Sequence, residues 1–280
     1  MGRSFFITGA NTGIGRATAL ALGRRGATLA LAGRSAERTQ PVLNELRDAG
    51  NEQVRFFSLS LDELASVRAC AAAFLATNEA LDVLVNNAGL AGSRGVTRDG
   101  FELTFGVNHL GHFLLTELLL PRLVASAVGK PTPGRIVNVS SIAHYRASAI
   151  DWSALRERTR SLTGLAEYRV SKLCNVLHAR SLARRLEHDN VHTYSLHPGV
   201  IASEIWRPIP WPIQPLMRRF MQSTEKGAET SLFCAASARS KEQTGLYYDA
   251  CRAIEPSPLA RDEALGRELF ERSQRWCGLA

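Results

Sequence analysis

The segment that decides the fold reads S-F-F-I-T-G-A-N-T-G-I-G and runs from Ser4 to Gly15. A short β-favouring run opens it, and an amphipathic helical pattern follows from Gly13. Three glycines with the spacing G-x-x-x-G-x-G, Gly9, Gly13 and Gly15, occupy the turn between the two. Such a turn lets the backbone approach a pyrophosphate, which rests on the positive end of the helix. The segment therefore predicts a strand–turn–helix unit that binds a dinucleotide.

The same alternation of short apolar runs and amphipathic stretches continues along all 280 residues, with no linker and no internal repeat. It is typical of βαβ units that form a parallel sheet with helices on both faces. The expected strands are Ser4–Thr8, Thr28–Ala32, Val54–Ser58, Leu81–Asn86, Arg135–Ser140, His192–Leu196 and Leu246–Tyr248. The expected helices are Gly13–Arg25, Ala36–Ala49, Glu63–Ala76, Gly100–Ser126, Leu165–Glu187, Thr224–Ala238 and Arg261–Arg275. We predict one doubly wound α/β domain of the Rossmann type, residues 1–280, around a seven-stranded, mostly parallel sheet.

Two segments break this rhythm, residues 143–167 and 205–221. The second contains four prolines, which disfavour a regular helix or a central strand. Both are expected to be surface loops near the carboxyl ends of strands, where sheets of this kind bind ligands. The apolar residues of 205–221 predict a lid over a hydrophobic substrate; packing on the core or on another subunit is the alternative. These residues are Trp206, Trp211, Pro212, Ile213, Leu216, Met217 and Phe220.

Composition limits the classes of partner. The formal charge is +8, but the basic residues are scattered and form no aromatic–basic motif, so we expect a solvated surface around a phosphate-bearing cofactor and no nucleic acid. Five cysteines without a C-x-x-C pair indicate reduced thiols in an intracellular, cytoplasmic protein. His109 and His112 lack an acid or cysteine to complete a metal site. The sequence contains no run of eighteen apolar residues, so we expect no helix that spans a membrane. Peripheral membrane contact through the arginines of 205–221 is left open.

A tyrosine and a lysine, Tyr168 and Lys172, stand four residues apart in Y-R-V-S-K. On a helix such positions share a face. An ammonium beside a phenol favours the phenolate, so a pKa of about 10 can be drawn toward working pH. The phenol can then exchange a proton with an alcohol or carbonyl oxygen. Together with the dinucleotide turn, this pair predicts hydride transfer.

The end of the second strand, L-A-G-R at Leu31–Arg34, bears on the choice of dinucleotide. Sites selective for NAD usually carry an acid there for the ribose 2′-hydroxyl. Here Gly33 is neutral and Arg34 is basic, which suits a 2′-phosphate, with Arg16 as a lesser candidate. We expect NADP(H) to be preferred over NAD(H), unless Arg34 is an ordinary solvated charge.

These motifs, taken in order, resemble the classical short-chain dehydrogenase/reductase family along essentially the whole chain. The matching stretches are T8-G-A-N-T-G-I-G15, N86-N-A-G89, Asn108, the V-S-S ending at Ser141, Y168-R-V-S-K172 and H197-P-G199. Residues 104–116 (T-F-G-V-N-H-L-G-H-F-L-L-T), residues 135–141 (R-I-V-N-V-S-S) and the E-P-S-P at Glu255 are similar to the retinol dehydrogenase-like branch. That branch also includes WW-domain oxidoreductases and protochlorophyllide reductases.

The resemblance implies roles for four catalytic residues. Tyr168 would be the general acid in reduction and the base in oxidation, and Lys172 would lower its pKa and bond the nicotinamide ribose. Ser141, preferred over Ser140, would stabilise the substrate oxygen, and Asn108 would hold a water linking Lys172 to solvent. The implied cofactor contacts, besides Tyr168 and Lys172, are Gly9, Asn11, Thr12, Gly13, Ile14, Gly15, Arg34, Ser60, Leu61, Asn86, Asn87, Ala88, Gly89, Pro198, Gly199, Val200 and Ser203.

The chain departs from the family pattern at three places. Ser60 stands where an aspartate often lies near the adenine, with Asp62 two residues later. Ser203 replaces the usual threonine after P-G. The gap between Ser141 and Tyr168 is longer than is usual and is expected to shape either the substrate entrance or packing between subunits. A homodimer and a monomer therefore both stay open.

The expected function is an NADP(H)-dependent oxidoreductase acting on a hydrophobic alcohol and its aldehyde or ketone, such as a retinoid, a lipid aldehyde or a polycyclic ketone. The nicotinamide carries the reaction, so no metal is needed. The alternatives are a light-driven or other double-bond reductase of the same family and a catalytically silent nucleotide-sensing protein. The complete set of Asn108, Ser141, Tyr168 and Lys172 favours the enzyme.

Overall fold

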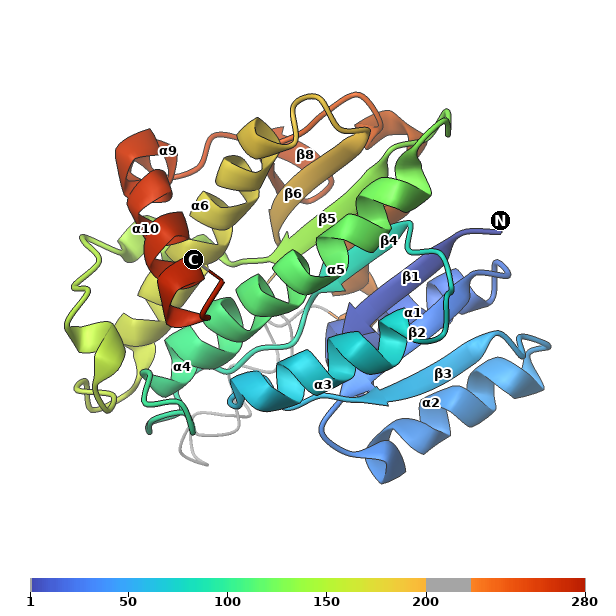
Figure 1. Cartoon of the computed structure of the whole chain (residues 1–280), viewed down its shortest axis with the longest axis horizontal. Helices are drawn as coiled ribbons and strands as arrows, with labels where there is room; N and C mark the ends of the chain where they lie inside the picture. The colour runs from blue at the N-terminus through green and yellow to red at the C-terminus, as the bar shows by residue number, and fades with distance from the viewer. Residues whose placement is uncertain (1, 200–222, 280) are drawn as a thin grey trace.

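The computed structural model describes residues 2–199 and 223–279, and its strands form one eight-stranded sheet. The strand order is β3-β2-β1-β4-β5-β6-β7-β8, and neighbours up to β7 pair in parallel (Figure 1). The strands are β1 Ser4–Thr8, β2 Thr28–Gly33, β3 Val54–Ser58, β4 Val83–Asn86, β5 Gly134–Val139, β6 Val191–His197, β7 Leu246–Asp249 and β8 Arg252–Ile254. The predicted doubly wound, mostly parallel α/β fold is confirmed.

One strand was not expected from the sequence. β8 pairs antiparallel with β7 at the edge of the sheet, and its three residues are exposed. The two strands are joined through Ala250 and Cys251, whose φ angles of 45° and 61° are both positive. A hairpin turn of this kind normally carries asparagine or glycine. The eighth strand was missed because that signal is absent and the strand is short.

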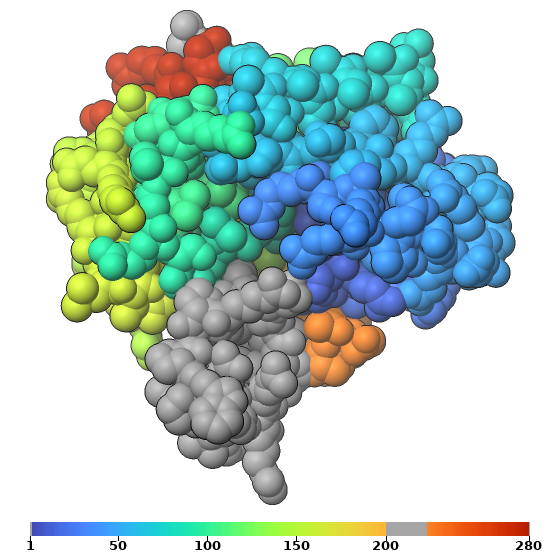
Figure 2. Space-filling model, turned by 90° about the horizontal axis from the view of Figure 1, so that it is seen from below, coloured from blue at the N-terminus to red at the C-terminus, as the bar shows by residue number. Residues whose placement is uncertain are grey.

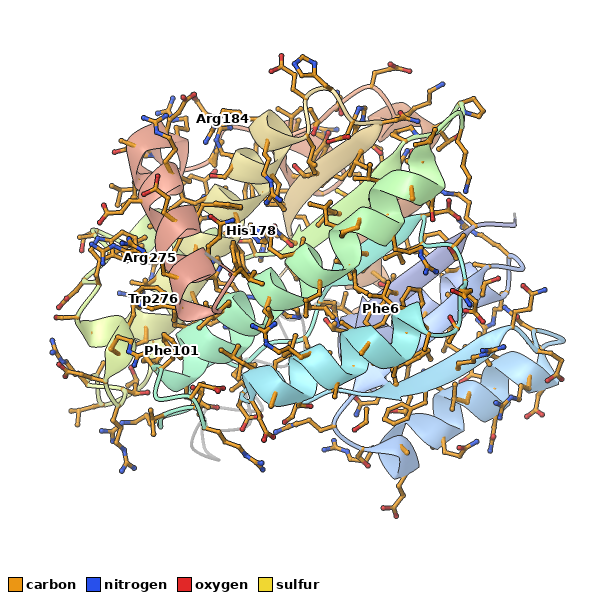
Figure 3. All side chains as sticks on the ribbon, in the orientation of Figure 1. Phe6, Phe101, His178, Arg184, Arg275 and Trp276 are labelled. Atoms are coloured by element: carbon orange, nitrogen blue, oxygen red, sulfur yellow. The ribbon has the colours of Figure 1, made fainter. Side chains whose placement is uncertain are left out.

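Helices cover both faces of the sheet. The described α-helices are α1 Gly13–Gly23, α2 Ala36–Asp48, α3 Leu64–Leu75, α4 Leu103–Phe105, α5 Gly111–Ala127, α6 Leu165–Arg185, α8 Thr224–Ala236, α9 Pro258–Arg261 and α10 Glu263–Trp276. In β1, Phe5 and Ile7 pack toward α1, α2 and α8, while Phe6 packs on the other face, where α3, α5 and α6 lie (Figures 1 and 3). Because both faces are buried, the strands read as nearly continuous apolar runs.

The helix predicted over Gly100–Ser126 is divided into three parts. Between α4 and α5 the backbone widens into a π-helical turn, η1 Gly106–Leu110, which contains Asn108. By length and composition Leu103–Ala127 could cross a membrane, yet 61% of its apolar window is buried inside the protein, which is typical of a core helix. The first residue of α5, Gly111, packs closely against the backbone at Leu61, because a Cβ on Gly111 would lie 2.6 Å from the Leu61 carbonyl oxygen.

The segment 143–167, expected to be a surface loop, is more ordered than that. It contains two 3-10 turns, η2 Ile142–Arg146 and η3 Ala154–Arg156. Thr159 is buried, and its backbone N–H donates to the Gly95 carbonyl over 3.1 Å. The other irregular segment, 205–221, lies outside the described residues.

The carboxyl-terminal helix α10 is anchored by aromatic packing. The ring of Trp276 lies 5.7 Å from that of Phe101 and 5.8 Å from that of Phe105 (Figure 3). Phe101 and Phe105 lead into η1. The end of the chain therefore supports the helix that carries Asn108.

Asn51 offers a test of how the first βαβ unit is held together. Its side-chain amide, 7% exposed, donates to the carbonyls of Gly23 and Ala27, each over 2.9 Å, and its oxygen accepts the N–H of Gln53 over 2.9 Å. Asn51→Ala removes all three hydrogen bonds, although the Gly23 carbonyl still accepts the Gly26 N–H, so we expect the free energy of unfolding in urea to fall by about 2–3 kcal/mol. Exposed Asn44→Ala on α2 is the control, with a change of about 0.5 kcal/mol or less. Equal losses in the two variants would contradict this account.

Candidate active site

A cavity of about 500 Å³ opens at the carboxyl ends of β1, β2, β3 and β4. On the face seen in Figure 2, the N-terminal part of the chain (blue) and a segment near residue 100 (green) lie on either side of a hollow. The lining residues are Thr8, Gly9, Asn11, Thr12, Gly13, Ile14, Gly15, Ala32, Gly33, Arg34, Arg38, Leu59, Leu61, Asp62, Asn87, Ala88, Gly89, Leu90, Ala91, Ser93, Leu103 and Val107. Eleven of the predicted cofactor contacts are among them: Gly9, Asn11, Thr12, Gly13, Ile14, Gly15, Arg34, Leu61, Asn87, Ala88 and Gly89.

The glycine turn is shaped by close backbone approach. A Cβ on Gly15 would lie 2.3 Å from the Gly9 carbonyl oxygen and 2.4 Å from the Asn87 side-chain nitrogen, so the third residue of α1 must be glycine. Gly9 and Gly13 have φ angles of 68° and 57°, which favour glycine. Within the described residues the N-cap Thr12 gives α1 no side-chain hydrogen bond, and no acid stands in its first turn. This positive helix end suits the pyrophosphate of a dinucleotide.

The end of β2 carries two cations toward the cavity. Arg34 follows the strand, and Arg38 lies in the first turn of α2, where the Ser35 hydroxyl accepts the Arg38 backbone N–H over 3.1 Å. The sequence reasoning missed Arg38, although Ser35 as a helix N-cap would have placed it near Arg34. Arg16, the lesser candidate for this role, forms an ion pair with Glu45 instead.

The end of β3 differs from its expected arrangement. Leu61 and Asp62 line the cavity, whereas Ser60 does not. The Ser60 hydroxyl donates to the Asp62 carboxylate over 2.5 Å, and the Ser60 N–H donates to the Ser66 hydroxyl over 2.9 Å. Ser60 therefore orients Asp62, which is a lining residue of the cavity although Ser60 is not.

The N-N-A-G stretch after β4 forms one wall. The Thr8 hydroxyl accepts the backbone N–H groups of Asn87 and Ala88 over 2.9 and 3.0 Å. Asn86 was expected to contact the cofactor, but its side chain is buried and connects β4 to α5 and β5. Its amide donates to the Thr116 hydroxyl over 2.9 Å and to the Asn138 side-chain oxygen over 2.8 Å.

The four predicted catalytic residues lie together behind this wall. A Cβ on Gly89 would lie 3.1 Å from Asn108 Oδ1 and 3.6 Å from Lys172 Nζ. Lys172 Nζ is 5.6 Å from the centre of the Tyr168 ring, and Tyr168 shares a side-chain hydrogen bond with Ser141. Three elements, η1, the end of β5 and α6, thus bring these groups together behind Gly89, although none of the four is among the lining residues of the cavity.

The protonation of the pair differs from the sequence expectation. Lys172, 2% exposed, donates to the Val139 carbonyl over 2.9 Å, and burial lowers its pKa to about 8. Burial raises the pKa of Tyr168, and the hydrogen bond with Ser141 only partly opposes this. The expected acidification of Tyr168 is therefore not found here, because desolvation of the phenolate outweighs the other influences. The phenol holds its proton at neutral pH.

The two serines after β5 have separate roles. Ser140 is buried, and its hydroxyl donates to the Lys172 backbone carbonyl over 2.7 Å, which ties α6 to the sheet. Ser141 accepts the Ala143 N–H over 3.2 Å and bonds Tyr168. Ser141 is thus the serine whose hydroxyl shares a site with the phenol, in agreement with the choice made from the sequence.

Asn108 fixes the end of the wall. Its side-chain oxygen accepts the Leu90 N–H over 2.7 Å, and its nitrogen donates to the Leu90 carbonyl over 2.9 Å and to the Ser171 hydroxyl over 3.0 Å. The expected link from Asn108 through water to Lys172 stays a prediction. The sequence reasoning also missed the apolar part of the lining, Leu90, Ala91, Leu103 and Val107, because no motif marks it.

Four expected contacts follow β6. Pro198 and Gly199 come directly after the strand, and Gly199 has a φ of 90° that favours glycine. They are not among the residues that line the cavity. Val200 and Ser203 lie outside the described residues.

The pKa of Lys172 can be tested through stability. The unfolded chain holds this proton up to about pH 10.5, whereas the folded chain releases it near pH 8. Since the unfolded state binds more protons between these values, the free energy of unfolding rises through this window. We expect the wild type to gain stability over Lys172→Met between pH 8 and 10 in urea titrations. A difference between the wild type and Lys172→Met that stayed constant across this range would refute the shift.

Comparison with known proteins places this geometry in a family. The family model "short chain dehydrogenase" matches residues 3–155. The chain is 44% identical to "Dehydrogenase/reductase SDR family member 13" of Bos taurus over 99% of this chain and 74% of that protein. It is 42% identical to "Retinol dehydrogenase 12" of Homo sapiens over 99% of this chain and 87% of that protein.

A solved structure of an uncharacterized protein from Mycobacterium Paratuberculosis is 30% identical, with a TM-score of 0.77 over 99% of this chain and 93% of that one. The crystal structure of an NADH-dependent reductase, A1-R', complexed with NAD is 25% identical, with a TM-score of 0.69 over 91% and 98% of the two chains. The chain belongs to the short-chain dehydrogenase/reductase family of nicotinamide-dependent oxidoreductases, in its retinol dehydrogenase-like branch.

Proposed function

We propose that this protein is an NADP(H)-dependent oxidoreductase that interconverts a hydrophobic alcohol and its aldehyde or ketone, with Tyr168 as the proton donor and acceptor. One observation carries the proposal. Lys172 and Asn108 stand directly behind Gly89, which lines a dinucleotide-sized cavity, and Lys172 and Ser141 both contact Tyr168. The acid–base group and the cofactor site therefore share one wall.

The preference for NADP(H) is supported by charge at the end of β2. Gly33, Arg34 and Arg38 line this part of the cavity, and α2 begins beside them at Ala36. A ribose 2′-phosphate would receive charge-assisted hydrogen bonds from the guanidinium groups and would lie near a positive helix end. Among the described residues that line this part of the cavity, Gly33, Arg34 and Arg38, none carries a carboxylate to accept the hydrogen of a 2′-hydroxyl.

The chemistry of the chain's own residues follows from the geometry. Bound reduced nicotinamide supplies the hydride. As the substrate carbonyl oxygen gains negative charge, the hydroxyls of Ser141 and Tyr168 donate to it, and Tyr168 passes on the proton that its raised pKa has kept in place. The ammonium of Lys172, 5.6 Å from the ring centre, stabilises the phenolate that is left. In the oxidative direction the same groups act in reverse.

A hydrophobic substrate is supported by two observations. The cavity wall beyond Gly89 is apolar, with Leu90, Ala91, Leu103 and Val107. Relatives that are 42% identical to the chain are named retinol dehydrogenases 11 and 12. We therefore propose a retinoid or a similar lipid aldehyde as substrate, in a cytoplasmic protein that is a homodimer or a monomer.

Tyr168→Phe tests the proton transfer. In the presence of NADPH and retinal, we expect turnover to fall by about 10²–10⁴-fold, because the variant has no proton to give. NADPH affinity should stay close to that of the wild type, as measured by fluorescence titration. Tyr248→Phe, on the face of the sheet that packs against α8, is the control and should keep its turnover. Undiminished turnover in Tyr168→Phe would point to a different acid or to a nucleotide sensor.

Arg34→Ala and Arg38→Ala test the choice of cofactor. Each variant loses a charged partner for the 2′-phosphate, so we expect the dissociation constant of NADPH to rise about 10- to 100-fold. The dissociation constant of NADH should change little. Arg24→Ala is the control, since Arg24 pairs with Glu45 on the surface. Wild-type protein that bound NADH as tightly as NADPH would overturn the assignment.

A further inference from the structure

The wall between the dinucleotide cavity and the catalytic residues, residues 87–90, is held by two clamps. At one end the hydroxyl of Thr8, which is fully buried on β1, accepts the N–H groups of Asn87 and Ala88 over 2.9 and 3.0 Å. At the other end the side chain of Asn108, also fully buried, bonds both backbone groups of Leu90 over 2.7 and 2.9 Å. The position of the wall therefore depends on the distance between Thr8 and Asn108.

A histidine connects the two clamps. His112, on α5 and 3% exposed, has Nδ1 3.1 Å from the Asn108 backbone carbonyl oxygen and Nε2 2.9 Å from the Thr8 hydroxyl. The carbonyl can only accept, so Nδ1 carries the hydrogen. Burial, with a further contribution from the charge of Lys172, lowers the pKa of His112 to about 4 and keeps the ring neutral. Nε2 is then an acceptor.

The Thr8 hydroxyl is fully used by this arrangement. A hydroxyl has one hydrogen to give and two lone pairs to receive. The hydrogen goes to His112 Nε2 at 2.9 Å in preference to the Val85 carbonyl at 3.5 Å, and the lone pairs take the Asn87 and Ala88 N–H groups. Loss of the imidazole would leave the hydroxyl free to rotate toward Val85 and disturb the wall.

We propose that His112 is a positioning residue, a neutral strut between Thr8 and Asn108 that sets the wall 87–90 against the dinucleotide and against Lys172. His112 is absent from the residues that line the cavity, so it acts through its two partners. The binding part of this proposal stands on the contacts alone, and its effect on turnover rests on the function proposed above.

His109 provides a matched control on the same stretch of helix. It is as buried as His112, at 1% exposed, but its Nε2 bonds the Ser273 hydroxyl on α10 over 3.1 Å. His109→Phe therefore removes a buried imidazole and a hydrogen bond to a hydroxyl without touching either clamp. It reports the cost to stability that any such replacement carries.

The experiment compares His112→Phe, His112→Asn and His109→Phe by melting temperature, NADPH affinity and turnover. We expect His112→Phe to raise the dissociation constant of NADPH about tenfold, because the wall must be ordered on binding, and to lower turnover as well. His112→Asn keeps a donor within reach of the Asn108 carbonyl and should recover part of the turnover but not the affinity. His109→Phe should lower the melting temperature while its NADPH affinity stays within about twofold of the wild type.

Two further measurements make the test independent of turnover and of cofactor. Thr8→Val combined with His112→Phe should weaken NADPH binding no more than the larger single change, because both remove one link. Hydrogen exchange should be faster at the amides of residues 87–90 in His112→Phe and unchanged there in His109→Phe. If the wild type bound neither NADPH nor NADH, the proposed function would fail, and this exchange would still decide the role of the strut. Unchanged exchange, or NADPH affinity equal to that of the wild type in His112→Phe, would overturn the inference.

Discussion

The buried ammonium of Lys172 is the contact on which the rest of the site depends. It donates to the Val139 carbonyl at the carboxyl end of β5, and the Ser140 hydroxyl returns a bond to the Lys172 backbone over 2.7 Å. These two bonds fix α6 against the sheet and so fix Tyr168, one turn earlier on the same helix. Burial of an ammonium costs free energy because the charge loses its hydration, and this loss lowers the pKa of Lys172.

The cavity and the buried Lys172 are separated by a single glycine, Gly89. The crowded glycine turn at Gly9 and Gly15 brings α1 against Asn87, and the wall then continues to Gly89, where a side chain would meet Asn108 and approach Lys172. The wall thus faces the cavity with its backbone at Gly89, and on its other side it lies against Asn108 and Lys172. The proposed cofactor binding and the proposed proton transfer thus share this wall, whose two clamps are joined by the contacts of His112.

Much of this could be predicted from the sequence, because local signals specify it. The spacing of the glycines predicted the β1–turn–α1 unit, and the apolar runs predicted the buried strands. Tyr168, Lys172 and Ser141 were found through their motifs. What depends on tertiary packing was missed. The direction of the Tyr168 pKa follows from burial, and the π-helical turn around Asn108 lies inside an unbroken helical pattern. The link through His112 joins elements far apart in sequence, so no spacing could reveal it.

The central claim is that hydride passes to a carbonyl carbon while Tyr168 supplies the proton, and isotope transfer measures this most directly. Protein mixed with retinal and NADPH carrying deuterium at both hydrogens of the nicotinamide C4 should yield retinol with one deuterium on the carbinol carbon, as read by mass spectrometry. Deuterium on an alkene carbon would indicate a double-bond reductase. Retinol without label, or no product with any carbonyl substrate of the hydrophobic class, would contradict the account.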